Sequence, residues 1–200
     1  MKKTFQFLWV ITFAAVIAVS LISCGKKSDT SDGADGKAGS FFKMFSSGTY
    51  HMKAKMAGGG MGIEMESFVK GGDSATIMKV IGQNTRMVSK DKKMYMINDS
   101  AKTVTVIPVQ TGSSEDPIKT DGMKLTGSGT AKFNGKDLPY EEYSDGKGNK
   151  VQYFLDGSKL AGIRNIINSK TVDIVILVLD QDVPAGVFDI PSGYKQVGAF

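Results

Sequence analysis

Apolar and polar residues alternate in short runs between Thr49 and Ile107, and turn residues separate the runs. Because successive side chains of a strand point to opposite faces, the run TYHMKAKMA places its tyrosine and methionines on one face and its histidine and lysines on the other. Turn residues such as Gly71-Gly72-Asp73 and Lys90-Asp91-Lys92 favour tight reversals between the runs. The pattern predicts an antiparallel meander with one apolar face, which protein or ligand must cover.

Strand signals resume at Leu125, after a polar excursion between Gln110 and Gly122. Asn134-Gly135 is a strong hairpin signal, and the run VDIVILVL lacks alternation, which is typical of a strand that is covered on both faces. We expect the closing segment 183–194 to tuck its phenylalanine and tyrosine against the sheet. About ten strands with little helix predict a mainly β fold, in which a curved antiparallel sheet forms an unclosed half-barrel.

Apolar residues at helical spacing follow Ser40, which is a suitable N-cap residue. Phe41, Met44 and Phe45 fall on one side of the helix that this spacing predicts. This helix would either plug the end of the sheet or act as a lid over a ligand. With a single turn expected within 110–122, the prediction is one or two short helices covering the mouth of the half-barrel.

The chain begins with two lysines, an apolar run from Phe5 to Ile22 and then small residues, which describes a secretory signal peptide. The apolar run is long for such a signal, so an uncleaved membrane-spanning anchor is the alternative. Leu21-Ile22-Ser23-Cys24 resembles the bacterial lipobox, and Cys24 is the single cysteine of the chain. The resemblance implies cleavage before Cys24, a diacylglyceryl group on its thiol and an acyl chain, such as palmitate, on its new amino terminus. Such chains anchor a protein to a membrane.

Residues 25–40 are rich in Gly, Ser, Asp and Lys and have almost nothing to bury, so they are predicted to stay flexible. A chain of this length reaches on the order of 20 Å. We therefore assign 1–23 to the signal peptide, 24–40 to a lipidated flexible tether and 41–200 to the half-barrel domain. Gly25 rather than Asp follows Cys24, and by analogy with sorting in bacterial envelopes this favours the outer membrane, facing the periplasm.

Composition and charge exclude several classes of function. The 200 residues, 41% of them hydrophobic and 22% charged, are typical of one globular domain. The formal net charge of +5 falls to +3 without Lys2 and Lys3, and no basic stretch is interleaved with aromatic residues, so no nucleic-acid partner is expected. His51 is the single histidine, which leaves too few members for a catalytic triad or a metal-histidine site. We predict that the protein is not an enzyme and uses no cofactor or metal.

Four motifs of the chain carry a resemblance to a known superfamily. They are the lipobox, the segment KDKKMYMIND, the hairpin strand VQYFLD and the closing VPAGVFDIPSGYK. Together with the short helix, they resemble the LolA/LolB superfamily of bacterial envelope lipid and lipoprotein carriers, over about Ser40 to Lys195. The resemblance implies an unclosed antiparallel half-barrel with helices across its mouth, whose concave apolar surface receives acyl chains.

Methionine is flexible and polarisable, which suits a surface that accepts chains of differing shape, although ordinary core filling explains the same residues. Met61, beside a glycine-rich loop tip, could alternatively be an exposed apolar finger that touches a membrane or partner. We predict a membrane-anchored lipoprotein that binds or carries a lipid or an acylated protein; the alternative is a structural or interaction lipoprotein with a filled core and no ligand. The predicted ligand-binding residues are Met52, Met56, Met61, Ile63, Met65, Ile77, Met87, Met94, Met96 and Phe154.

Overall fold

The computed structural model describes residues 36–57, 63–80, 83–108, 124–146, 148–167 and 170–198. Within these ranges the chain forms one helix, α2 (Gly39–Ser46), and twelve strands. The strands are β1 (Thr49–Ala57), β2 (Ile63–Lys70), β3 (Asp73–Val80), β4 (Gln83–Lys90), β5 (Lys93–Asn98), β6 (Thr103–Pro108), β7 (Lys124–Phe133), β8 (Lys136–Ser144), β9 (Lys150–Asp156), β10 (Lys159–Ile167), β11 (Lys170–Asp180) and β12 (Lys195–Gly198). The predicted second lid, at 110–122, and the lipobox cysteine lie outside the described residues.

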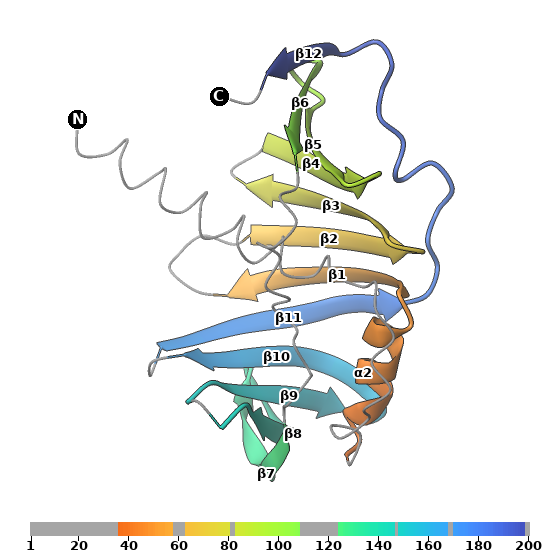
Figure 1. The fold of residues 1–200 in the computed structure, drawn as a ribbon. Coiled ribbons are helices and arrows are strands. Elements are labelled where there is room, and N and C mark those ends of the chain that lie inside the picture. Colours follow the sequence, from red (N-terminus) through yellow and green to blue (C-terminus); the bar gives the residue numbers. More distant parts are fainter. Residues whose placement is uncertain are drawn as a thin grey trace, which may run out of the picture.

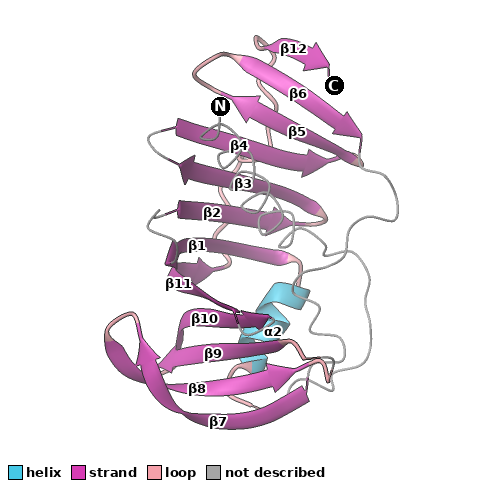
Figure 2. Cartoon of the chain, turned by 90° about the vertical axis from the view of Figure 1, so that its left-hand side faces the viewer, coloured by secondary structure: helices cyan, strands magenta, loops and turns pink. Residues whose placement is uncertain are grey.

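All of these strands belong to one sheet, in the order β12-β6-β5-β4-β3-β2-β1-β11-β10-β9-β8-β7 (Figure 1). β1–β6 form one antiparallel meander, β7–β11 form a second, and the pairing of β1 with β11 joins them. The edge strands β7 and β12 lie at opposite ends of this order, so hydrogen bonds do not close the sheet, and Figure 2 shows it curling at β7–β9. The predicted fold, a mainly β unclosed half-barrel with a short helix, is confirmed.

Tight turns set the register of both meanders. Gly71 and Gly72, with φ of 63° and 94°, form a two-residue turn that places Lys70 opposite Asp73. Asn134 and Gly135, with φ of 47° and 82°, do the same between β7 and β8. Two-residue hairpin turns of this kind need positive φ, which Gly and Asn adopt most readily. The turn positions predicted from these residues are confirmed.

Two faces of the sheet are distinguished by what packs on them. The inner face, as we use the term, carries Tyr50, Met52 and Ala54 of β1 and packs with α2 in the main hydrophobic core. The outer face carries the residues between them, such as His51 and Lys53. Because paired positions on neighbouring strands share a face, the pairing register assigns every paired position to one side or the other.

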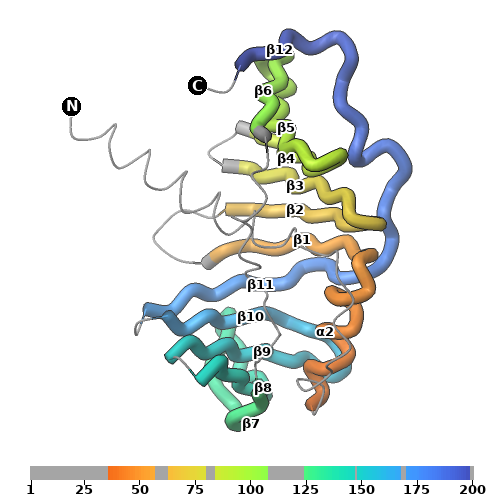
Figure 3. The backbone as a smooth tube through the Cα atoms, viewed as in Figure 1, coloured from red at the N-terminus to blue at the C-terminus, as the bar shows by residue number. Residues whose placement is uncertain are grey.

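The outer face of β2–β6 is covered by the C-terminal strap, residues 181–194, which Figure 3 shows running from β11 to β12 past the ends of the first meander. Phe188 and Tyr194 of the strap pack, half-buried, against a second core of Phe68, Val88 and Ile97. The prediction that this segment tucks its aromatic residues against the sheet is therefore confirmed. The strap leads into β12, which runs parallel to β6 and which the alternation pattern does not predict.

Polar contacts fix the C-terminal strap at its far end. The Tyr194 hydroxyl donates a 3.0 Å hydrogen bond to Asp99 Oδ1, and this bond raises the pKa of Tyr194. Arg86 Nη1 donates to the carbonyl oxygen of Asp189 at 3.2 Å. The backbone amide of Lys195 donates to the carbonyl of Lys102 at 2.9 Å, so the strap is already aligned with the sheet where β12 begins.

The β7–β8 hairpin folds over the outer face of β9–β11. Phe133, at the end of β7, stacks on Phe154 of β9 with ring centroids 4.4 Å apart. The Arg164 guanidinium lies 5.0 Å from the Phe154 ring centroid and makes two hydrogen bonds to Asp173, of 2.7 and 2.8 Å. Gly162 has to lack a side chain, because a Cβ there would clash with the Phe133 ring and lie 2.7 Å from the carbonyl oxygen of Ile174.

Replacing Gly162 with alanine is expected to lower the free energy of unfolding by about 1–3 kcal/mol, because the added methyl group overpacks this contact. Urea denaturation measures the change. Gly127→Ala is the matched control, since an added Cβ there has no neighbour within 4 Å. Equal stability of the two variants would contradict the packing of Phe133 on Gly162.

Candidate functional site

The inner face of the first meander is a surface of methionines and small residues. Successive pairings connect Met52 of β1, Ser67 of β2, Thr76 of β3, Met87 of β4 and Met96 of β5 in one row across the sheet. The next row on the same face runs through Ala54, Met65, Met78 and Thr85. At the described and paired positions of β1–β5, this face carries no charged side chain.

The structure brings most of the predicted ligand-binding residues together. Met52, Met56, Met65, Met87 and Met94 belong to the core that includes α2. Ile63 pairs with Met56, and Met96 pairs with Met87, so both lie on the same face. Met96 is 38% exposed, more than the others. Met61 lies outside the described residues.

Ile77 and Phe154 lie on the opposite face from the other predicted residues, so the predicted set does not form one surface. Ile77 packs in the second core, under the C-terminal strap. The two-residue turn at Gly71 and Gly72 places Met78, rather than Ile77, opposite Met65. A count from that turn identifies the correct face from sequence alone, because a shift of one residue reverses every side chain of a strand.

On β9, too, adjacent residues point to opposite faces of the sheet, and this places Phe154 on the outer one. Its neighbours Tyr153 and Leu155 point to the inner face and belong to the main core, whereas Phe154 packs with Phe133 and Leu138 on the outer side. Alternation within the run VQYFLD makes Phe154 differ from both neighbours. The prediction that Phe154 lies on the inner face is therefore wrong, and the aromatic residue of β9 on that face is Tyr153.

Helix α2 packs on the inner face through its aromatic side chains. The Phe42 ring meets the rings of Tyr143 and Tyr153 edge to face, with centroids 5.0 and 4.9 Å apart, and Phe45 meets Tyr50 at 5.2 Å. Burial of Tyr153, with a smaller effect of Tyr143, raises its pKa. The helix thus lies against β1 and the β8–β10 side of the sheet, as Figures 1 and 2 show.

Glu141 of β8 binds the start of this helix. Its Oε1 accepts a 2.8 Å hydrogen bond from the Lys37 amide, and its Oε2 accepts bonds from the Ala38 amide at 2.9 Å and the Tyr143 hydroxyl at 3.2 Å. The helix has Ala38 as its N-cap residue and no side-chain cap of its own. The carboxylate from the sheet therefore supplies the capping that we expected from Ser40, which lies inside the first turn.

Sequence reasoning missed Glu141 because the two partners lie more than a hundred positions apart in the chain. Gly36 adds to the same contact, since a Cβ there would clash with the Glu141 carboxylate and the Tyr143 hydroxyl. Local pattern predicts the helix but contains no signal for the strand that caps it.

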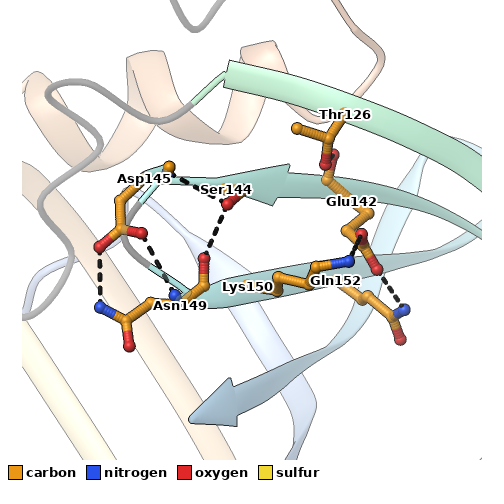
Figure 4. A network of polar contacts seen from close by, with 8 residues as sticks. Thr126, Glu142, Ser144, Asp145, Asn149, Lys150 and Gln152 are labelled. Carbon is orange, nitrogen blue, oxygen red and sulfur yellow. Dashed lines mark hydrogen bonds and ion pairs between the residues drawn. The ribbon is translucent and has the colours of Figure 1, made fainter. Parts of the chain in front are cut away.

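A polar network stiffens the β8–β9 hairpin on its outer side (Figure 4). The Glu142 carboxylate accepts hydrogen bonds from Lys150 Nζ at 2.8 Å and from Gln152 Nε2 at 2.9 Å, which lower its pKa. At the turn, the Asn149 side-chain amide donates to Asp145 Oδ2 at 2.7 Å. These bonds join β8 to β9 on the face away from the helix and close the turn between them.

Charged groups gather on the outer face of β1 and β2. His51 lies between two carboxylates, with Nε2 2.9 Å from Glu66 Oε1 and Nδ1 3.3 Å from Asp180 Oδ1, and its ring stacks on Phe68. Lys55 pairs with Glu64 at 2.9 Å, and this bond lowers the pKa of Glu64. Within the described part of the chain, no three His, Cys, Asp or Glu side chains are grouped so that they could hold a metal ion. Nor is any helix there long and apolar enough to cross a membrane.

No protein-family model matches the sequence, and neither does a curated protein. Among solved structures, an uncharacterized conserved protein from Thermus thermophilus matches 75% of this chain and 90% of its own, at 8% identity and a TM-score of 0.49. MucB matches 74% of this chain and 59% of its own, at 12% identity and a TM-score of 0.42. LprF from Mycobacterium bovis matches 80% and 97%, at 10% identity and a TM-score of 0.40. These similarities are distant, so function has to be inferred from the side chains of this chain.

Replacing Glu141 with alanine is expected to lower the free energy of unfolding by about 1.5–3 kcal/mol, because amides at the start of α2 lose a charged acceptor. Glu142→Ala, the neighbour on the opposite face, is the control. Its ion pair is with a half-exposed lysine, so about 1 kcal/mol or less is expected. Urea denaturation gives both values, and hydrogen exchange of the helix amides should accelerate in the Glu141 variant alone. Equal effects of the two variants would show that the carboxylate does not hold the helix.

Proposed function

We propose that this chain is a membrane-anchored bacterial lipoprotein whose inner face binds the acyl chains of a lipid or of an acylated protein. The observation that carries the proposal is the uncharged, methionine-rich inner face of β1–β5 in an open sheet. Methionine suits a surface that accepts chains of differing shape. Helix α2 makes its ring contacts with β1, β8 and β9 and so lies toward the other half of the sheet.

The amino-terminal sequence supports the anchor. Cys24 ends the lipobox-like Leu21-Ile22-Ser23-Cys24, and residues 25–35 have a composition typical of a flexible linker. Residues 36–40, which the sequence assigns to the same tether, lie in the folded domain, because Ala38 is fully buried and α2 begins at Gly39. The proposed location is the bacterial envelope, with Gly25 after the cysteine favouring the outer membrane and its periplasmic side. We infer binding rather than catalysis, because His51 is held between two carboxylates on the outer face, away from the apolar surface.

A second candidate function is a structural lipoprotein that presents its loops to an envelope partner. Burial favours it, because Met52, Met65 and Met87 are only 2–3% exposed, as in an ordinary filled core. The two functions differ in one property, the ability to take up an acyl chain.

Acyl binding is tested on residues 24–200 with Cys24→Ala. All contacts of the fold described above join residues within 36–198, so this chain retains them. We expect lipid in the purified protein by mass spectrometry, or saturable one-to-one binding of a fluorescent fatty acid. If the protein contains no lipid and takes up no dye, the carrier function is rejected in favour of the structural one.

Met78 and Ile77 provide a matched pair of variants, because these half-buried neighbours on β3 point to opposite faces. Met78→Asn is expected to weaken binding of the fluorescent fatty acid about five- to tenfold through lost apolar contact. Ile77→Asn should leave the affinity unchanged, although it disturbs the core under the C-terminal strap. Melting temperatures of both proteins exclude unfolding as the cause. A larger loss of affinity in the Ile77 variant would place the ligand on the outer face and contradict the proposal.

The lipid anchor is tested on the full chain in a bacterial host. We expect radioactive palmitate to label the wild-type protein and not the Cys24→Ser variant. A chain that starts at residue 24 with Cys24→Ser should remain in the aqueous phase of a detergent phase separation. Its recovery with membranes would contradict anchoring through Cys24.

A further inference from the structure

Hydroxyl side chains form a patch on the methionine-rich inner face, extending toward the ends of β3 and β4 at the turns. Ser67 of β2 pairs with Thr76 of β3, and Ser74 of β3 pairs with Ser89 of β4, all on the inner face. We call these four residues the hydroxyl patch. Side chains two positions apart on a strand lie about 7 Å from each other, and neighbouring strands lie about 5 Å apart, so one small ligand group can reach several of them.

One hydroxyl of this patch is unsatisfied. Ser67 Oγ and Thr76 Oγ1 are 3.3 Å apart, so one of these hydroxyls donates a hydrogen bond to the other. Ser74 Oγ is buried, in a residue that is 1% exposed, and finds no hydrogen-bond partner among the described residues. Most buried polar groups in proteins are paired, and an unpaired one costs about 1–3 kcal/mol. Ser74 Oγ also has almost no accessible surface, so a ligand reaches it only by displacing the groups that cover it; an acceptor placed there then satisfies a hydroxyl that lacks a partner among the described residues.

The surroundings of Ser74 define the chemistry of that acceptor. Its cross-strand neighbours on the inner face are Val69 and Ser89, and Met94 pairs with Ser89. The described inner-face positions of β1–β5 carry no charged group that could compensate a buried carboxylate or phosphate. A carbonyl oxygen is an uncharged acceptor that a serine hydroxyl can satisfy.

We infer that the inner face binds an acyl chain through an uncharged ester or amide, whose carbonyl oxygen accepts a hydrogen bond from Ser74. This inference rests on the proposed function and specifies its ligand class: the linkage enters with the chain, and any charged headgroup stays outside. Free fatty acid anions are then poorer ligands than neutral acyl esters of the same length.

Two neutral probes of equal chain length isolate the carbonyl. 1-Monopalmitoylglycerol has an ester carbonyl, and 1-O-hexadecylglycerol has an ether in its place. Both compete for residues 24–200 with Cys24→Ala against N-phenyl-1-naphthylamine, an uncharged fluorescent dye. We expect the ester to bind about three- to tenfold more tightly than the ether, as one hydrogen bond allows. Palmitate at pH 8 should bind more weakly than the ester.

Ser74→Ala should abolish the preference for the ester while leaving ether binding unchanged. Ser100→Ala, in an exposed turn after β5, is the control and should keep the preference. Because Ser74 Oγ has no hydrogen-bond partner among the described residues, the variant should melt at the same temperature as the parent protein or higher. A fall of more than about 3 °C would show that a protein group already satisfies this hydroxyl.

The outcomes separate the two claims. Displacement of the dye by both probes with equal affinity, or a preference that survives in Ser74→Ala, overturns the inference while acyl binding stands. Tighter binding of palmitate than of the ester overturns the exclusion of charge. Failure of both neutral probes and of palmitate to bind overturns the proposed function itself.

Discussion

The antiparallel pairing of β1 with β11 is the interaction on which the rest of the structure depends. It sets Met52 beside Leu179 and Met56 beside Ile174, so two separate meanders share one apolar inner face. His51 strengthens the same junction from the outer side, because its imidazole meets carboxylates of β2 and of the end of β11. Without this pairing, helix α2 would contact Tyr50 and the tyrosines of β8 and β9 on unconnected sheets.

Much of the fold could be predicted from sequence, because strands and tight turns have local signals. Gly71-Gly72 and Asn134-Gly135 identify two hairpins, and alternation in TYHMKAKMA identifies the inner face of β1. The assignment of Ile77 to that face was wrong because apolar character was read without counting from the turn. Both faces of β3 are partly apolar, since the C-terminal strap supplies a second core, so hydrophobicity alone does not distinguish them.

The remaining features come from contacts between distant segments. The capping of α2 by Glu141 and the close approach of Phe133 to Gly162 have no local signature. The hydroxyl patch was missed for a different reason. Assigning Ile77 to the apolar face places Ser74 and Thr76 on the polar one, although the register turns them inward among methionines. A candidate binding surface is therefore defined by register more than by composition.

The two edges of the open sheet differ in how well they are protected against pairing with another molecule. An unpaired strand edge can template addition of a strand from another molecule, and natural sheets protect such edges with short strands, charges or covering segments. Here the C-terminal strap carries β12 onto the free side of β6, with four residues in parallel register. The opposite edge, β7, has lysines at both ends of a glycine- and serine-containing strand. Strand β12 thus acts against self-association, because it occupies the backbone groups of β6 beside Val104 and Val106 that a strand from another molecule would otherwise pair with.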